Sequence, residues 1–220
     1  MIASMTGARA GPAGPRLLEL IEASVTRLGA HRIRLGRRRR LSLPDDLDAV
    51  LVVISGRLAA SLSAGDGRET FVADVGPGEL IGENFALERS KTSLAVEVEE
   101  PGESYWFEAS RFAALLESNG SFAAAAVREM CSRQSRMLQR LGEIATLPMP
   151  QRLAAELIRL ALASPSGTVI AQMPTHEEIA RRIATQREAV TKELSRLRRS
   201  GDIERDGAAL VLAGSRWRRR

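Results

Sequence analysis

Short apolar stretches separated by turn-forming residues run through the first half of the chain, from about residue 28 to residue 107. Ala49–Ile54 is rich in β-branched side chains and ends at Ser55-Gly56, and the stretches 57–63 and 69–75 flank the turn Gly65-Asp66-Gly67. An Asp-Gly pair between two apolar stretches indicates a hairpin, because glycine accepts a positive φ. Further short strands or turns are expected at Leu80–Glu83, Leu94–Val98 and Tyr105–Phe107. Short strands at this spacing predict an antiparallel sandwich or barrel.

From Arg111 to Ala145 the apolar positions repeat with helical spacing, interrupted at Ser118-Asn119-Gly120. Beyond the interruption they alternate three and four residues apart, which places a narrow apolar stripe along one face of a helix. The stripe has one row of Val127, Gln134 and Leu141 and a second row of Cys131, Leu138 and Ala145, with Met130 and Met137 beside them. The pattern favours a homodimer in which two such helices pair as a coiled coil; the alternative is one buried helix in a monomer. On this stripe Cys131 is expected to be a small buried apolar residue.

The last third of the chain begins at Pro148-Met149-Pro150 and is predominantly helical in pattern. An amphipathic helix is expected over 151–163, with its leucines on one face, and a short strand over 169–173. Two capping boxes follow ten residues apart, one at Thr175–Glu178 and one at Thr185–Glu188, and each predicts the start of a helix.

These two capping boxes predict one helix through Ile183 and a second through Leu197, ended by Ser200-Gly201-Asp202. Two helices so close together must cross by a tight turn, which is helix-turn-helix geometry. The stretches 203–205 and 209–212 flank the turn Asp206-Gly207 and predict a β-hairpin. A hairpin after such a helix pair makes a winged helix-turn-helix.

The composition is that of an ordinary soluble globular protein, with 44% hydrophobic and 27% charged residues among 220, enough for one large or two small domains. No apolar stretch reaches the roughly 18–20 residues that a bilayer span needs. Residues 1–15 are rich in glycine and proline and lack an apolar centre, so we expect a flexible tail rather than a signal peptide. Cys131 is the single cysteine, which excludes an intramolecular disulfide and a cysteine-cluster zinc or iron–sulfur site. The cytoplasm is the expected location.

The charge is unevenly distributed along the chain. Residues 1–147 carry 18 basic and 19 acidic side chains, whereas residues 148–220 carry 14 basic and 8 acidic ones. A basic domain beside a near-neutral one favours a polyanionic partner, most commonly nucleic acid, although an arginine-rich composition can also follow from codon usage. The four arginines at 37–40 are more typical of a solvated sheet edge than of a ligand site.

The second helix of the predicted pair carries polar residues on the face that a recognition helix turns toward base edges. Arg187 is suited to bidentate contact with guanine, and Glu188 can accept a hydrogen bond from cytosine N4. The expected DNA-contacting residues are Thr175, Thr185, Gln186, Arg187, Glu188, Thr191, Lys192 and Arg196. Apolar residues form the opposite face, at Ala189, Val190, Leu194 and Leu197. Surrounding arginines, such as Arg198 and Arg199, can meet phosphates without reading sequence. The alternative is a winged helix that binds protein.

With these motifs the chain resembles the CRP/FNR family of bacterial transcription regulators over nearly its whole length. Val53–Leu58 is similar to the strand-glycine turn of the family's cyclic-nucleotide-binding β-roll, and Gly76–Glu83 to its Pro-Gly…Gly-Glu turn. Glu177–Leu197 resembles the DNA-reading motif, and Gly201-Asp202-Ile203 the step into the wing. The resemblance implies a homodimer on a palindromic site in double-stranded DNA, a sensory β-roll and contact with RNA polymerase. It also implies base reading by Arg187, Glu188 and Lys192, where the lysine replaces an arginine and lacks its planar fork.

The resemblance also implies a place for an effector, and there the chain departs from cyclic-AMP binders. The expected pocket residues are Gly82, Glu83, Asn84, Arg89, Lys91, Thr92, Met137 and Leu138. Gly82-Glu83 keeps the ribose-binding pair, but Thr92-Ser93 stands where cyclic-AMP binders carry Arg-Ser. Met137-Leu138 replaces the hydroxyl pair that touches the purine. Cyclic AMP is therefore not the expected effector, and an apolar small molecule, a degenerate nucleotide pocket or no effector remain as alternatives.

No cofactor is expected. An iron–sulfur cluster of the FNR type needs several N-terminal cysteines, and His31 and His176 are the sole histidine candidates for a haem axial ligand. Neither a nucleophile–base pair nor a phosphate-binding glycine loop occurs in the sequence, which argues against an enzyme. The predicted fold is α+β, with a flexible tail over 1–15, an antiparallel β-roll over 16–118, a dimerisation helix over 119–147 and a winged helix-turn-helix over 148–220. The predicted function is a homodimeric, sequence-specific, DNA-binding transcription regulator, and the alternative is a ligand-binding signalling module that acts through protein partners; neither involves a membrane.

Overall fold

The computed structural model describes residues 16–37, 40–43, 48–63, 69–88, 94–162, 164, 166–214 and 217. The chain forms two compact units that divide between Met137 and Leu138, inside a long helix. Each unit has a hydrophobic core of its own.

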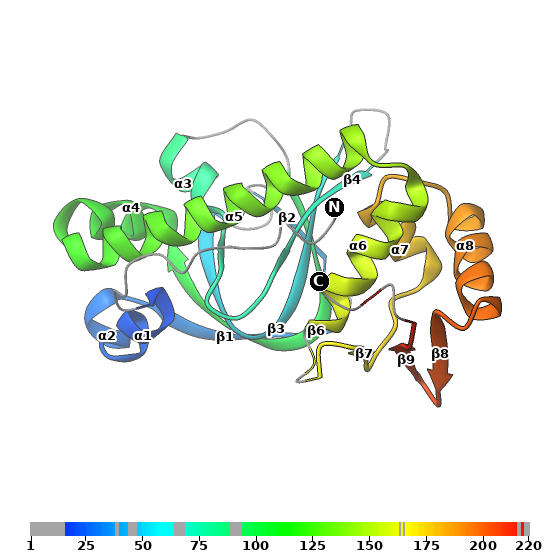
Figure 1. The fold of residues 1–220 in the computed structure, drawn as a ribbon. Coiled ribbons are helices and arrows are strands. Elements are labelled where there is room, and N and C mark those ends of the chain that lie inside the picture. Colours follow the sequence, from blue (N-terminus) through cyan, green and yellow to red (C-terminus); the bar gives the residue numbers. More distant parts are fainter. Residues whose placement is uncertain are drawn as a thin grey trace. The chain divides into compact units, whose positions relative to one another are not determined.

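The N-terminal unit contains an antiparallel sheet with four strands in the order β1 (His31–Leu35), β6 (Leu94–Glu108), β3 (Ala49–Ser63) and β4 (Glu69–Val75) (Figure 1). Two short strands extend it: β2 (Arg40–Leu43) pairs with β6, and β5 (Leu80–Ile81) pairs with β3. The predicted antiparallel domain is therefore confirmed. The predicted turn Gly65-Asp66-Gly67 lies outside the described residues, between Ser63 and Glu69, which pair across the hairpin.

The prediction of uniformly short strands is wrong for β3 and β6, which are 15 residues long and pair over most of their length. Ser55-Gly56 does not end the first of these strands; instead the register shifts there and both strands continue. Two glycines allow this, because a Cβ atom on Gly102 would lie 1.9 Å from the Ser55 carbonyl oxygen and one on Gly56 would lie 2.6 Å from that of Glu100. Gly56 also has a φ of +85°, which glycine adopts without strain.

Strand β3 is apolar at successive positions because both of its faces are covered. Val50 and Val52 pack with the core that contains Phe107, Phe112 and Phe122, whose rings meet edge to face with centroids 5.6–6.1 Å apart. The alternate residues of β3 pack into a second core on the other face. A strand buried on both sides loses the alternating pattern of a half-exposed one.

Helices cover the core that contains the phenylalanines. They are α1 (Leu17–Glu22), α2 (Val25–Leu28), α4 (Ala109–Ser118) and the first part of α5 (Gly120–Thr146), and a short helix, α3 (Glu83–Glu88), follows β5. The predicted interruption at residues 118–120 is confirmed, because Asn119 separates α4 from α5 and its side chain accepts a hydrogen bond from the Phe122 N–H. Beyond it, α5 continues for 27 residues.

The C-terminal unit is a winged helix-turn-helix, as predicted. Helix α6 (Met149–Ala161) begins two residues before the predicted start, with Pro150 in its first turn, where a missing N–H costs nothing. Helices α7 (His176–Arg182) and α8 (Arg187–Arg199) follow, and then the hairpin of β8 (Ile203–Asp206) and β9 (Ala209–Leu212). The predicted strand at 169–173 is limited to β7 (Val169–Ile170), which pairs with β9.

The first predicted capping box is confirmed and the second is wrong. The Thr175 hydroxyl accepts a hydrogen bond from the Glu178 N–H, and the Glu178 carboxylate accepts one from the Thr175 N–H, at 3.2 and 2.6 Å. At the second site the N-cap is Gln186, without a capping hydrogen bond from its side chain. The Thr185 N–H instead closes the preceding turn on the Ala180 carbonyl. The helix therefore starts one residue later, and Glu188 no longer occupies the third position that a capping box needs.

Candidate functional site

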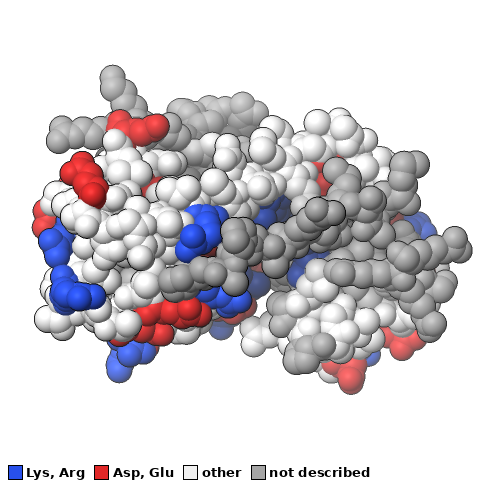
Figure 2. Space-filling view, turned by 60° about the vertical axis from the view of Figure 1, so that its left-hand side comes forward, with Lys and Arg blue, Asp and Glu red and all other residues white. Residues whose placement is uncertain are grey.

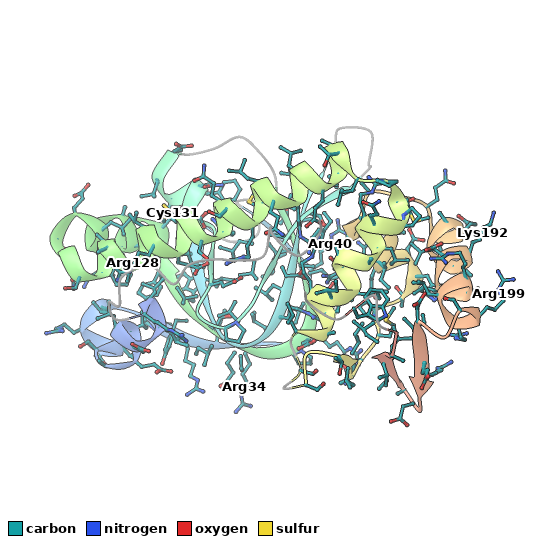
Figure 3. All side chains as sticks on the ribbon, viewed as in Figure 1. Arg34, Arg40, Arg128, Cys131, Lys192 and Arg199 are labelled. Atoms are coloured by element: carbon teal, nitrogen blue, oxygen red, sulfur yellow. The ribbon has the colours of Figure 1, made fainter. Side chains whose placement is uncertain are left out.

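Helix α8 separates its apolar residues from its polar ones. Val190, Leu194 and Leu197 are buried in the core of the C-terminal unit. The exposed side of the helix and its N-terminus consist of polar and charged residues, namely Gln186, Arg187, Glu188, Thr191, Lys192, Ser195, Arg196, Arg198 and Arg199. Figure 3 shows Lys192 and Arg199 extending from α8 on its outer side. Six of the eight residues predicted to contact DNA are thus exposed on α8 or at its N-terminus.

The turn between α7 and α8 fixes the angle at which α8 leaves α7. Ala184 adopts a φ of +51°, which is the single left-handed conformation of a non-glycine residue in the described part of the chain. The Ala184 N–H bonds to the Arg181 carbonyl and the Thr185 N–H to that of Ala180. Across the same turn, Nδ1 of His176 in α7 lies 2.7 Å from the Thr191 hydroxyl in α8. The Thr191 hydroxyl is therefore engaged within the motif.

Besides Thr191, three of the predicted DNA-contacting residues take part in local structure. Arg196 forms two hydrogen bonds with Glu193, at 2.7 and 2.9 Å, and this pairing raises the pKa of the Arg196 guanidinium. Thr175 is exposed, but its hydroxyl caps α7. Thr185 is half-buried in the turn. The sequence pattern predicts the capping role of Thr175, but it gives no sign of the pairing between Arg196 and Glu193.

A buried ion pair stands where the resemblance implies the effector pocket. Glu83 is 4% exposed, and both of its carboxylate oxygens accept hydrogen bonds from the guanidinium of Arg133 in α5, which also donates to the Leu80 carbonyl. Gly82, with a φ of +101°, lies so close to β3 that a Cβ atom would be 2.3 Å from the Ala49 carbonyl oxygen. The sequence gives no local signal for Arg133, which lies 50 residues beyond its partner.

Among the described residues, no other predicted pocket residue takes part in this ion pair. Asn84 and Met137 are exposed, and Leu138 belongs to the C-terminal unit. Arg89, Lys91 and Thr92 lie outside the described residues.

A half-open cavity of about 620 Å³ lies elsewhere in the N-terminal unit, between α1, the turn at residues 77–79 and α5. Arg136 bridges two carboxylates on its wall, Glu79 at 2.7 Å and Glu129 at 3.4 Å. Burial, together with the nearby charge of Glu79, raises the pKa of Glu129 to about 7 despite the neighbouring Arg136. Burial raises the pKa of Glu79 as well.

On the face seen in Figure 2, acidic and basic side chains are interspersed.

The stripe of apolar residues on α5 faces away from the core of its own chain. Val127, Leu138 and Leu141 are 52%, 61% and 62% exposed, and Gln134 and Ala145 are exposed with them. Cys131, labelled on α5 in Figure 3, is also exposed, so a single chain does not provide its expected burial. The alternative of one helix whose stripe is buried in a monomer is therefore wrong.

The described residues contain no cluster of three or more His, Cys, Asp or Glu side chains placed to hold a metal ion. None of the helices in the described ranges combines the length and the apolar character that crossing a bilayer requires.

Comparison with known proteins matches two parts of the chain to families. Residues 151–213 match the Crp-like helix-turn-helix domain, and residues 43–119 match the cyclic nucleotide-binding domain. A CRP-like cAMP-activated global transcriptional regulator from Mycobacterium tuberculosis is 25% identical over 173 residues, which cover 76% of this chain and 77% of the relative.

Solved structures are similar over most of the chain. The c-di-GMP responsive global regulator CLP from Xanthomonas campestris has a TM-score of 0.71 at 21% identity, covering 88% of this chain and 100% of that chain. A transcriptional regulator of the CRP/FNR family from Thermus thermophilus has a TM-score of 0.68 at 18% identity, covering 84% and 95%. At these identities the structures establish the fold.

Proposed function

Because the chain belongs to the CRP/FNR family of DNA-binding transcription regulators, which are not enzymes, we propose that it acts as a homodimer that reads a palindromic site through α8. The observation that carries this proposal is the exposed polar face of α8, which stands opposite a buried apolar face. A helix of this kind can enter the major groove, which admits an α-helix and presents a distinct pattern for each base pair.

The roles on this face follow from the side-chain chemistry. Arg187 would donate two parallel hydrogen bonds to O6 and N7 of guanine, and Glu188 would accept one from cytosine N4. Lys192 would act as a point charge rather than a fork. Arg198 and Arg199, on the last turn, would contact phosphates and add affinity that depends on salt but not on sequence.

The proposal of a dimer rests on the exposed stripe of α5. Val127, Leu138 and Leu141 recur at a spacing that keeps them on one side of the helix, and each is more than half exposed in the single chain. Pairing this stripe with that of a second chain removes it from water, as in a coiled coil. Two winged helices on one symmetry axis would then address two inverted half-sites.

The relative from Mycobacterium tuberculosis is described as activated by cAMP, but we propose that cyclic AMP is not the effector of this protein. A cyclic nucleotide needs a cation for its phosphate and hydrogen-bonding partners for its ribose and base. Glu83, the residue expected on the ribose, is already paired with Arg133, and Met137 has no group that could hydrogen-bond a purine. We propose no resident cofactor, and we infer contact with RNA polymerase in the cytoplasm from family membership.

Selection of bound duplexes from a random pool tests this function, followed by titration across ionic strength. We expect an inverted repeat and a steep fall in affinity with salt, because binding releases counterions from phosphates. Binding without sequence preference would contradict base reading by α8. If the protein does not bind duplex DNA at low salt, the alternative of a signalling module acting through protein partners is favoured instead.

A further inference from the structure

We propose that a buried ion network centred on Glu156 fixes each recognition helix relative to the dimer seam, and thereby sets the half-site spacing that the protein accepts. The inference rests on the proposed homodimeric DNA-binding function and deepens it. The network consists of Arg140 and Glu143 in α5, Glu156 and Arg159 in α6, and Arg182 in α7.

The last turns of α5 carry both the seam and one end of the network. Leu138 and Leu141 of the apolar stripe are exposed there. Arg140 and Glu143 each follow one of these leucines by two residues, about 200° around the helix, and so lie on the other side. All four residues belong to the same compact unit as the winged helix-turn-helix. The seam and the DNA-reading helix can therefore be connected within one unit.

Glu156 forms ion pairs with one arginine from each of α5, α6 and α7. It is 1% exposed, and its carboxylate lies 2.9 Å from Arg159, 3.3 Å from Arg140 and 3.4 Å from Arg182. Burial by itself raises the pKa of Glu156, but the three guanidinium groups outweigh burial and lower it. The carboxylate thus stays ionised at neutral pH and holds α5, α6 and α7 at one point.

Additional hydrogen bonds fix the orientation of α5 relative to α6 and α7. Nη1 of Arg159 lies 2.8 and 2.9 Å from the two oxygens of Glu143, which joins α6 to α5 a second time. Arg140 also donates to the Arg182 carbonyl at 3.3 Å, which joins α5 directly to α7. Only Leu147 and Pro148 separate α5 from α6 in the chain. Ion pairs with two defined contacts restrict sliding and rotation more than apolar packing does.

The recognition helix α8 is connected to α7 by the contact between His176 and Thr191 and by the tight turn at Ala184.

A change of one base pair in the spacing rotates one half-site by about 35° and moves it by about 3.4 Å relative to the other. A stiff connection from seam to recognition helix rejects such a change, whereas a loose connection tolerates it.

The test uses full-length wild-type protein and the Arg140→Gln variant. Arg140→Gln removes the direct link from the seam helix to Glu156, while it leaves Glu156 paired with Arg159 and Arg182 and Glu143 paired with Arg159. Arg136→Gln is the matched control, because Arg136 also lies on α5 but pairs with Glu79 and Glu129 in the other unit. The probes are duplexes with two inverted copies of the half-site selected by the wild-type protein, at spacings that vary by single base pairs, and a duplex with one half-site.

We expect the wild type and Arg136→Gln to bind the best spacing about tenfold or more tightly than its neighbours, which corresponds to at least the cost of one mismatched base pair. Arg140→Gln should reduce this ratio to about threefold or less while retaining the wild-type affinity and base preference on the single half-site. Glu143→Gln, which leaves Arg159 on Glu156, should change the ratio in the same direction.

An Arg140→Gln protein that keeps the wild-type ratio would overturn the inference. Loss of single half-site binding in both Arg140→Gln and Glu143→Gln would also overturn it, because the network would then maintain the fold of the domain rather than its position. A wild-type protein without any spacing preference would overturn it as well, because the connection would then be loose, whereas equal affinity for paired and single half-sites would count against the proposed dimer.

Discussion

The Thr191 hydroxyl lies 2.7 Å from Nδ1 of His176 and 3.0 Å from the carbonyl oxygen of Arg187, one turn earlier in α8. A hydroxyl has one hydrogen, and here Thr191 donates it to the Arg187 carbonyl, so Nδ1 of His176 must be the donor to Thr191. This contact ties the first turn of α7 to the segment of α8 that presents Arg187. It assigns Thr191 to holding the recognition helix in place.

Replacing Thr191 with valine keeps the shape of the side chain and removes both hydrogen bonds. We expect the free energy of unfolding to fall by about 0.5–1.5 kcal/mol, because the His176 N–H loses its partner. Urea unfolding of the variant measures this. Ser195→Ala is the control, since the Ser195 hydroxyl bonds within α8, to the Thr191 carbonyl; an equal loss in both variants would contradict the role of His176.

Arg187→Ala should weaken binding to the selected DNA site by about 1–3 kcal/mol and relax the preference at one base pair in each half-site. The physical reason is the loss of two directed hydrogen bonds to one guanine. Binding measured on a panel of single-base variants gives both effects. Arg198→Ala should instead reduce the salt dependence and leave the base preference intact, and an unchanged preference in Arg187→Ala would remove that residue from base reading.

Leu138→Glu should dissociate the dimer, because it places two like charges opposite each other in a desolvated seam. Sedimentation velocity at several protein concentrations measures the change. Leu87→Glu is a matched control, since Leu87 is 47% exposed on α3 and is not part of the stripe. If the two variants sediment alike as dimers, the seam does not run through Leu138.

Glu129→Gln should stabilise the protein at pH 8 and leave its stability unchanged near pH 4. In the folded state the pKa of Glu129 is about 7, above the ordinary value of 4.5. The folded protein therefore binds the proton more tightly, and stability is lost as pH rises between these values. Glutamine mimics the protonated form, so the gain at pH 8 is on the order of 1–3 kcal/mol. Thermal unfolding at both pH values checks this, with exposed Glu117→Gln as the control; a variant no more stable than wild type at pH 8 would be the contrary result.

Cyclic AMP should not raise the melting temperature. A ligand at a hundred times its dissociation constant stabilises the folded state by about 2.7 kcal/mol, which a melting curve detects easily. We expect the curves with and without millimolar cyclic AMP to coincide. A clear upward shift would mean that cyclic AMP enters a pocket despite the pairing of Glu83 with Arg133.

The order of elements could be predicted from the sequence because glycine breaks, helical spacing and one capping box mark them locally. The lengths of β3 and β6 could not be predicted. In the sequence Gly56 indicates a turn, whereas in the structure it allows two long strands to pass close to each other. The predicted start of α8 was one residue too early, because a local pattern was again satisfied by a different contact in the structure. Thr185 satisfies the sequence pattern of a cap, but its N–H completes the turn on Ala180.

For the candidate site, the polar face of α8 could be predicted, because the helical spacing of its polar and apolar residues is visible within one short segment of the sequence. The pairs Glu83–Arg133 and Glu156–Arg182 could not, because their members lie 50 and 26 residues apart and depend on how helices pack. In the sequence alone, a buried glutamate such as Glu156 cannot be distinguished from a glutamate on an exposed helix face, because its arginine partners come from other helices.

The paired glycines in β3 and β6 limit how the β-roll can deform. Where these strands bend together, carbonyl oxygens of each already occupy the space in which a methyl group would sit on the other, so the corner is at its limit of compression. Flexing must then take place at the loops or at the helices. This crossing of β3 and β6 is therefore a fixed point of the sheet.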